Sequence, residues 1–293
     1  MKKYLGMLGL LIVTVIWGGG FVASDIALSS LSPAHILVTR FLLASVLMFP
    51  LCARHLKSIK KQEIRAGIIL GVYLFAAFAL QIVGLKYTTP SKNAFLTATN
   101  VVFVPFIARV LYRKHVSVQG VIGAFMAIAG AGVLSLDKNF AIGLGDGLTL
   151  LCAVCFALHI FFTGEYVEKY RVTVLIFFQM VTAFAFSLFY LLITGGWGEF
   201  SMTREGILSV LYLGAVSTTL TYLIQTASQQ YVDETRSAII LSMEAVFGTL
   251  FSVLLLHEKI DGKMVAGCIL ILGAVLVSEI KIMPLSRCER DTA

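Results

Sequence analysis

Ten apolar stretches follow one another along this chain, separated by short polar gaps. A helix needs about 20 apolar residues to cross the roughly 30 Å hydrocarbon core of a bilayer. Only helices and closed barrels satisfy every backbone polar group in lipid, and these stretches are too long and too continuously apolar for barrel strands. The sequence therefore predicts an all-α integral membrane protein with ten transmembrane helices. We place them at residues 5–24, 34–53, 66–86, 94–112, 116–136, 145–163, 173–194, 206–229, 236–256 and 263–282.

The charged residues gather in the gaps between these stretches. They make up only 13% of the chain, and 58% of the residues are apolar, against about 25% and 45–50% in soluble domains. This composition argues against a water-soluble enzyme, a disordered chain or a nucleic-acid-binding protein. The net charge of +7 fits the positive-inside rule instead. Sixteen of the 23 lysines and arginines fall on one side if the N-terminus is cytoplasmic, so both termini are expected there.

The first apolar stretch has an alternative interpretation as a cleaved signal peptide. Met1-Lys2-Lys3 precedes the apolar run, and Val22-Ala23-Ser24 resembles a cleavage site. Cleavage would leave nine spans.

The second part of the chain repeats the first. Residues 87–134 align without a gap with residues 231–278 at a constant shift of 144. The first two helices align with the sixth and seventh at a shift of 139, more weakly. A first repeat at residues 1–140 and a second at residues 141–293 follow from this pattern. Since five helices are an odd number, the second repeat enters the membrane from the opposite side, an arrangement that suits alternating access.

Polar side chains inside the predicted spans fall at equivalent positions of the two repeats. The pairs are Gln81 with Gln225, Asn100 with Glu244, and Arg40 with Gln179. A polar side chain in a bilayer costs free energy, and symmetric positions are expected of groups that line a cavity at the repeat interface. Helical spacing places aromatic and histidine side chains on the same faces. The predicted substrate-binding set is Trp17, Arg40, Gln81, Asn100, Phe156, His159, Gln179, Tyr222, Gln225 and Glu244.

These polar residues also have structural alternatives. Glu244 can couple transport to protons, or it can be an ion-pair partner of Arg40. Arg40 can bind a carboxylate or phosphate through its planar fork, or its side chain can extend to the outer surface. His159 and the amides can be interhelical hydrogen-bonding residues. The fifth and tenth helices carry no comparable polar stripe, so we expect them at the periphery.

Two backbone features lie within the spans. The glycines Gly18, Gly19 and Gly20 permit either the close approach of another helix or a hinge. Pro105 removes one backbone hydrogen bond in the fourth span and can kink it.

Motifs of several enzyme classes are missing from the sequence. It contains no HExxH metal site and no GxSxG nucleophile elbow. Cys152-Ala153-Val154-Cys155 lies in an apolar stretch without a second pair of cysteines, so neither a metal nor a disulfide framework is expected. We predict no catalytic residue, no metal and no cofactor.

Several segments resemble the drug/metabolite transporter superfamily and, within it, the ten-helix EamA family. They include Trp17-Gly18 with Phe21, the segment 85–89, and the segment 242–247. The family commonly has Glu-Pro where this chain has Glu244-Ala245. The resemblance implies an inverted-repeat transporter of the bacterial cytoplasmic membrane, often an exporter of amino acids, other metabolites or toxic compounds. It also implies a cavity lined by helices one to four and six to nine, and a supporting role for Glu258.

The prediction is therefore a secondary transporter or facilitator of small polar metabolites, most simply an exporter of amino acids or related compounds. Export of cationic drugs and transport of nucleotide-linked sugars are the alternatives on the same fold. A membrane-embedded enzyme and a signalling subunit are the alternatives from other classes. The expected partners are the lipid bilayer and a small-molecule substrate, with protons and a homodimer left open and no nucleic acid.

Overall fold

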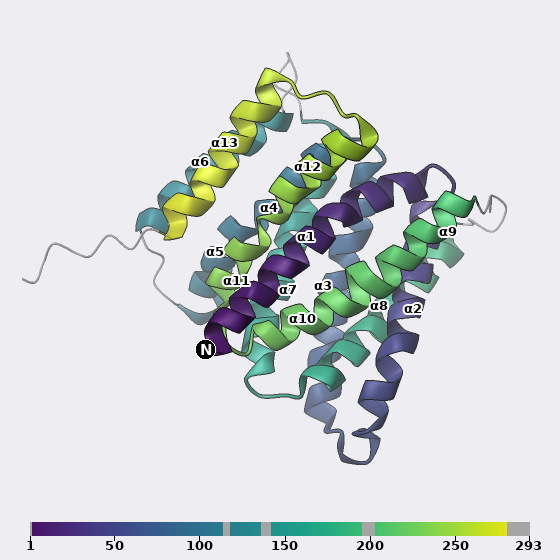
Figure 1. The fold of residues 1–293 in the computed structure, drawn as a ribbon. Helices are drawn as coiled ribbons and strands as arrows, with labels where there is room; N and C mark the ends of the chain where they lie inside the picture. The colour runs from purple at the N-terminus through teal and green to yellow at the C-terminus, as the bar shows by residue number, and fades with distance from the viewer. Residues whose placement is uncertain (1, 114–117, 136–141, 195–202, 280–293) are drawn as a thin grey trace, which may run out of the picture.

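The computed structural model describes residues 2–113, 118–135, 142–194 and 203–279, and within these ranges the regular secondary structure is helical. Figure 1 shows the helices gathered into one bundle. In chain order the elements are α1 (Lys2–Leu28), α2 (Pro33–Ala53), η1 (Leu56–Ser58), α3 (Lys61–Leu85), α4 (Pro90–Ala98), α5 (Asn100–Tyr112), α6 (Val118–Ser135), α7 (Leu144–Val167), α8 (Val172–Thr194), α9 (Arg204–Leu211), η3 (Tyr212–Leu220), α10 (Thr221–Ser228), α11 (Glu234–Leu241), α12 (Glu244–Leu256) and α13 (Gly262–Glu279).

Among the described residues, eight helical segments are long and apolar enough to cross a membrane. They correspond to the first four predicted spans and to the sixth through ninth. The fifth and tenth predicted spans correspond to α6 and α13, each of 18 residues. Large apolar side chains are left uncovered on the outside of the bundle, among them Val46 (60% exposed), Phe125 (70%) and Phe189 (61%). Such an exterior suits a lipid environment.

The fourth and ninth predicted spans are each divided into two helices, which corrects the expectation of continuous helices. The first break lies at Thr99, whose hydroxyl donates to the carbonyl of Leu96 (2.6 Å). The second lies at Ser242, whose hydroxyl donates to the carbonyl of Ile239 (2.6 Å). A hydroxyl bonded to a carbonyl one turn earlier competes with the helical ladder and favours bending. Pro105, where a kink was expected, lies inside α5.

The eighth span contains a π-helical segment, η3, between α9 and α10. The hydroxyl of Thr219 donates to the carbonyl of Gly214, five residues earlier, at 2.7 Å. π-helical segments are rare in proteins, and those that occur are often found at functional sites.

Helix boundaries recur along the chain at the shift found in the sequence. α5 and α12 begin and end at positions 144 residues apart. The two residues with positive φ among those described, Arg113 and His257, are also separated by 144 and end α5 and α12. The caps Thr89 and Asp233, again 144 apart, each accept a backbone N–H in the first turn of their helices.

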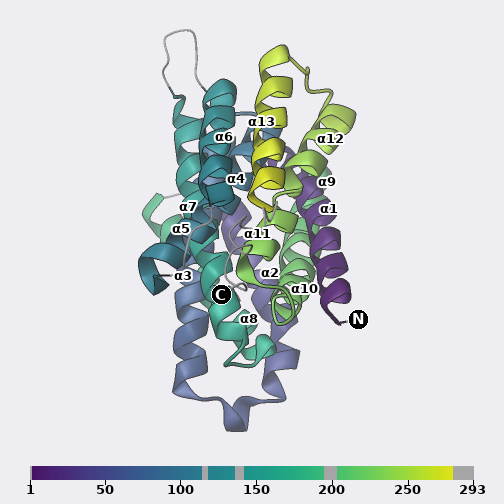
Figure 2. The same cartoon turned by 90° about the vertical axis from the view of Figure 1, so that its left-hand side faces the viewer.

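The packing separates a central group of helices from a peripheral pair. α3 packs against α7 and α8, α2 against α8 and η3, and α1 against α12 and α10. α6 and α13 pack against each other; they stand at one edge of the bundle in Figure 1, and Figure 2 views this edge from the front. This agrees with the peripheral position expected for the fifth and tenth spans.

Gly18 marks the closest approach between α1 and α12. A Cβ atom added there would lie 2.8 Å from the backbone nitrogen of Gly248. A Cβ at Gly248 itself would lie 2.8 Å from the Cβ of Ala94 in α4 and 3.2 Å from the ring of Phe21 in α1. The glycines of α1 therefore serve close helix packing in this structure.

Candidate functional site

A partly open cavity lies among α1, α2, α3, α4, α5, α7, α10 and α12. Its space for water-sized molecules is about 30 Å³, within about 540 Å³ of non-atom space that includes open solvent. Nine of the ten residues predicted to bind substrate line it. They are Trp17, Arg40, Gln81, Asn100, Phe156, His159, Tyr222, Gln225 and Glu244. The tenth, Gln179 of α8, is not among the lining residues. Both the first half of the chain and the second contribute polar groups to this one space.

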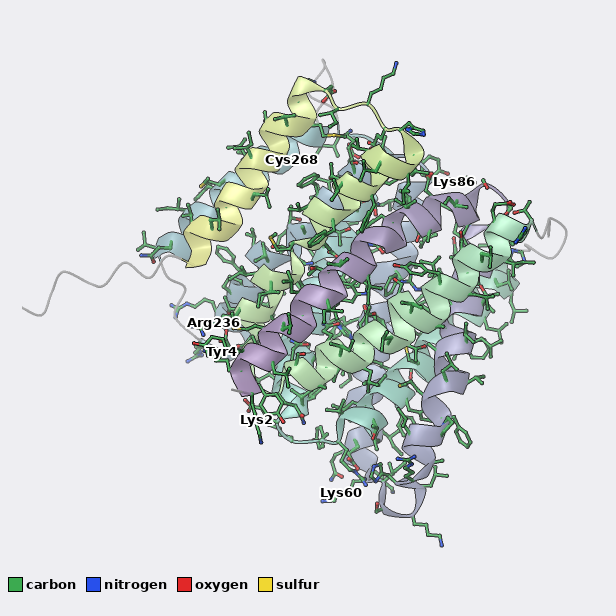
Figure 3. The ribbon with its side chains drawn as sticks, in the orientation of Figure 1. Lys2, Tyr4, Lys60, Lys86, Arg236 and Cys268 are labelled. Carbon is green, nitrogen blue, oxygen red and sulfur yellow. The ribbon has the colours of Figure 1, made fainter. Side chains whose placement is uncertain are left out.

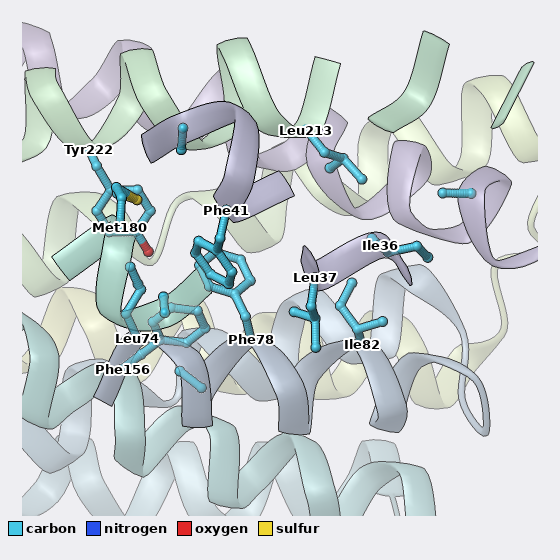
Figure 4. Close-up of a cluster of buried hydrophobic side chains, with 14 of the residues drawn as sticks. Ile36, Leu37, Phe41, Leu74, Phe78, Ile82, Phe156, Met180, Leu213 and Tyr222 are labelled. Carbon is cyan, nitrogen blue, oxygen red and sulfur yellow. The ribbon is translucent and has the colours of Figure 1, made fainter. Parts of the chain in front are cut away.

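Aromatic rings form one wall of the cavity. Tyr222 is fully buried and its ring centroid lies 5.5 Å from that of Trp17 and 5.5 Å from that of His159. Phe78 stands edge-on to Phe156, with centroids 5.2 Å apart. Figure 4 shows Phe78, Phe156 and Tyr222 grouped with Phe41 in the central apolar cluster. The wall is continuous with the hydrophobic core, so the core packing holds the rings in place.

Arg40 is buried, with 2% of its surface exposed. Its Nε donates to the hydroxyl of Thr218 (2.5 Å) and its Nη2 to the hydroxyl of Ser217 (3.4 Å). Its guanidinium carbon lies 3.9 Å from the ring centroid of Phe78, a cation–π arrangement. The alternative in which the side chain extends to the outer surface is therefore wrong.

The π segment explains how two consecutive residues reach Arg40. In η3 the wider turn places Ser217 and Thr218 so that both hydroxyls contact the guanidinium. The carbonyl of Ser217 also accepts the indole N–H of Trp17 (2.9 Å). η3 thereby connects Arg40 on α2 with Trp17 on α1.

Glu244 begins α12, directly after the second helix break. It is 5% exposed and lines the cavity. The described residues offer it no hydrogen bond, and Arg40 does not form an ion pair with it. The alternative of a structural Arg40–Glu244 pair is therefore wrong in this conformation. Asn100, at the equivalent place on α5, has an unpaired side-chain oxygen.

Gln179 lies behind the cavity and contacts one of its lining residues. Its Oε1 is 3.1 Å from Nε2 of His159. Both side chains are buried, at 1% exposure. Gln179 is thus positioned to orient the imidazole, and it has no direct place on the cavity wall.

Other lining residues were not in the predicted set. Phe78 has no sequence signal of its own, because it is one of many apolar residues in its helix. It precedes Gln81 by one helical turn and shares its face. Asn93 lies on the polar stripe of the fourth span and is fully buried. Its Nδ2 donates to the hydroxyl of Thr149 (2.8 Å), which ties α4 to α7.

Each end of the bundle has its own set of ion pairs and hydrogen bonds between helix ends. Figure 3 shows Lys2 and Lys60 toward one end and Lys86 toward the other. At the end that contains Lys60, Nη2 of Arg171 lies 2.7 Å from Oε2 of Glu63 and also donates to the carbonyl of Ser58. These bonds to Glu63 raise the pKa of Arg171.

The end that contains Lys86 has a second set of ties, all on the start of α4. Asp146 accepts from Nζ of Lys92 (3.0 Å) and from the hydroxyl of Thr88 (2.6 Å). Glu258 accepts from the hydroxyl of Ser91 (2.8 Å). The contact matches the supporting role expected for Glu258.

Clusters of three or more His, Cys, Asp or Glu side chains that could hold a metal ion do not occur among the described residues. The cavity has the groups of a candidate binding site, since hydrogen-bonding groups, one carboxylate and one guanidinium line a partly open space beside the aromatic wall.

The chain is similar to known proteins along nearly its whole length. An uncharacterized transporter of Archaeoglobus fulgidus is 32% identical over 96% of this chain and 88% of its own length. A probable amino-acid metabolite efflux pump of Salmonella typhimurium is 25% identical over 95% of both chains. A crystal structure with 16% identity superposes with a TM-score of 0.71 over 94% of this chain and 97% of the other, which shows the fold.

The family comparison covers both halves of the chain. The model of the EamA-like transporter family matches residues 4–136 and again residues 143–279. Together with the apolar helices, the match identifies a multi-pass membrane transporter. The chain belongs to the EamA-like transporter family.

Proposed function

We propose that this transporter exports amino acids or closely related small polar metabolites across the cytoplasmic membrane. The observation that carries the proposal is the single cavity that holds Arg40 from the first half of the chain and Gln225 and Glu244 from the second. A cavity with a guanidinium, a carboxylate and amides complements a small zwitterion. The efflux pump of Salmonella typhimurium, which is named for amino-acid metabolites, supports this substrate class.

The proposed mechanism is alternating access by two five-helix halves, residues 1–140 and 141–293, of inverted topology. The recurrence of helix boundaries at a shift of 144 and the two separate family matches support a duplicated chain. Inverted repeats allow the two halves to exchange conformations around a fixed central site. The breaks at Thr99 and Ser242 supply positions where half-helices can change angle without breaking a continuous ladder.

The proposed orientation places both termini in the cytoplasm. Lys60 and Arg171 then lie at the cytoplasmic end, and Lys86 and Lys92 at the outer end. The positive-inside rule favours this sense, because the majority of basic residues falls in the cytoplasmic loops. Under this orientation Arg171–Glu63 is a cytoplasmic tie and Lys92–Asp146 an outer tie.

Proton coupling through Glu244 is the proposed energy source. Glu244 is the one carboxylate among the described residues that line the cavity. A buried carboxylate without an ion-pair partner can gain or lose a proton as the cavity opens to either side. Facilitated diffusion is the alternative, and it requires no titrating group.

Counterflow in proteoliposomes tests the proposal. Radiolabelled amino acids are supplied to wild type and to Glu244→Gln, with and without a pH gradient. Flux that responds to the gradient in wild type and loses this response in Glu244→Gln is expected. Gradient-independent flux unchanged by the substitution would establish a facilitator. No flux of any amino acid by folded protein would overturn the substrate class and favour cationic drugs or nucleotide-linked sugars.

A further inference from the structure

The amide of Gln225 has a fixed orientation because a chain of hydrogen bonds determines it. Gln229 Nε2 donates to the backbone carbonyl of Ile160 (3.2 Å), a group that only accepts. Gln229 Oε1 therefore faces Gln225, whose Nε2 donates to it (3.3 Å). Gln225 Oε1 is left unpaired in a residue that is 1% exposed and lines the cavity.

The amide of Asn93 is fixed in the same way. The hydroxyl of Thr149 donates to the carbonyl of Gly145 (2.8 Å), so toward Asn93 it acts as an acceptor. Asn93 Nδ2 donates to that hydroxyl (2.8 Å) and to the backbone carbonyl of Gln81 (3.3 Å). Asn93 Oδ1 is consequently a second unpaired acceptor in the cavity wall, in a residue with no exposed surface.

The charged groups of the cavity are unequally available. Glu244 has no hydrogen bond or ion pair with the described chain, so its carboxylate is a third free acceptor. Arg40 is already engaged through Nε, through Nη2 and through the face of its guanidinium on Phe78. A ligand carboxylate can reach only the remaining N–H groups of Arg40. To bind through the others, it would have to break the three contacts that Arg40 already makes.

We infer that the cavity recognises substrates by their amino group and does not require their carboxylate. A protonated amine carries three N–H donors and a positive charge, and the cavity offers it the unpaired side-chain oxygens of Gln225, Asn93 and Asn100 and the carboxylate of Glu244. Trp17 and Tyr222 line the same cavity, and the faces of aromatic rings attract cations. The ligands therefore include primary amines and the amides and esters of amino acids, as well as amino acids themselves. This inference rests on the proposed function and specifies its substrate class.

A binding titration that does not depend on flux tests the inference. The chain has two tryptophans, Trp17 and Trp197, so the background variant Trp197→Phe leaves Trp17 as a fluorescent probe in the cavity wall. Three matched sets of ligands are titrated: leucine, phenylalanine and threonine. Each set contains the free amino acid, its amide, its decarboxylated amine and its N-acetyl derivative.

The two ends of each ligand are expected to contribute unequally. The amide and the amine bind within about threefold of the parent amino acid, because the carboxylate contact is optional. N-acetylation removes the charge and two donors, and weakens binding roughly tenfold to a hundredfold. The same order is expected when the compounds compete in counterflow.

A matched pair of glutamine variants locates the recognition. Gln225→Met removes the fixed acceptor at similar side-chain volume and is expected to reduce the preference for the amine over its N-acetyl form by about tenfold. Gln230→Met makes the same change at an exposed neighbouring position and leaves the preference unchanged. The ligand comparison on the Trp197→Phe background alone remains decisive if Gln225→Met does not fold.

Each outcome separates the inference from the proposed function. N-acetyl derivatives that bind like the parents, or amides that lose as much affinity as N-acetyl derivatives, would overturn amine recognition while leaving amino-acid transport intact. Amines that bind where no amino acid binds would support amine recognition and overturn the amino-acid proposal. A complete absence of binding by folded protein would overturn both.

Discussion

The two broken helices of this transporter share their geometry and differ in what restrains them. The α4–α5 and α11–α12 pairs occupy equivalent positions at a shift of 144. The start of α4 is bonded to distant segments through Lys92–Asp146 and Ser91–Glu258. At the start of α11, the hydrogen bond and ion pair of Asp233 join it only to Arg236, three residues later.

This difference shows that helices with equivalent backbones can be held by different side-chain contacts. The start of α4 is bonded to residues of α7 and to Glu258, whereas the capping contacts of Asp233 stay within the first turn of α11. If the halves exchange conformations during transport, the long-range ties of α4 must open and comparable ties must form elsewhere. The breaks themselves also differ in chemistry, because Asn100 begins α5 and Glu244 begins α12.

The largest expected effect comes from truncating the side chains that begin α5 and α12. Glu244→Ala should reduce counterflow at least about tenfold, since contacts to a charged group contribute about 1.5–3 kcal/mol. Asn100→Ala should reduce it less, about twofold to tenfold, because neutral hydrogen bonds contribute about 0.5–1.5 kcal/mol. Initial rates in proteoliposomes provide the measurement.

Glu205→Ala serves as the control for these two variants, because Glu205 is an exposed carboxylate on α9 and outside the cavity. It should retain wild-type flux. Equal losses in Glu244→Ala and Asn100→Ala would show that the two breaks are chemically equivalent and would contradict the assigned special role of Glu244.

A smaller effect is expected from the caps and ties at the starts of α4 and α11. Asp146→Asn should lower stability by about 1–3 kcal/mol, because the carboxylate is 4% exposed and accepts from both Lys92 and Thr88. Asp233→Asn should cost a few tenths of a kcal/mol, since asparagine caps a helix about as well as aspartate. Its ion pair with Arg236 is exposed and contributes roughly 0–1 kcal/mol.

Thermal unfolding of the purified proteins in one detergent compares these two variants. The Tm of Asp146→Asn should fall clearly below that of Asp233→Asn. Equal Tm values would mean that the long-range tie contributes no more than the local cap, and the contrast between α4 and α11 would then have no energetic basis.

The cavity could be predicted from sequence because its residues obey the repeat. Gln81 and Gln225 are separated by 144, as are Asn100 and Glu244, and equivalent positions of two similar halves meet at their interface. Gln179 depended on the weaker shift of 139, and the structure places it behind His159 rather than on the cavity wall.

The remaining features depend on contacts that hydropathy does not encode. The helix breaks at Thr99, where the hydroxyl is bonded to a carbonyl of its own helix. Because the apolar stretches contain many hydroxyl side chains, the sequence does not show which of them breaks a helix. The capture of Arg40 depends on the π segment, which brings Ser217 and Thr218 to the same guanidinium. The regular 3.6-residue period of an α-helix does not predict that two consecutive residues contact the same guanidinium.

A proline at the second break is expected to have only a modest effect. Ala245 is the second residue of α12, and its N–H donates to the carbonyl of Ser242 (3.1 Å) in a tight turn outside the regular ladder. Ala245→Pro should therefore cost about 1 kcal/mol, the contribution of one hydrogen bond, because proline is tolerated in the first turn of a helix. Ala238→Pro, in the interior of α11, should cost about 3 kcal/mol or more, since it removes a ladder hydrogen bond and introduces a clash. The two Tm values and the counterflow of each variant provide the test. If Ala245→Pro lowers the Tm as much as Ala238→Pro, the chain at residues 242–244 behaves as an unbroken helix. The ninth span would then not share the helix break of the fourth.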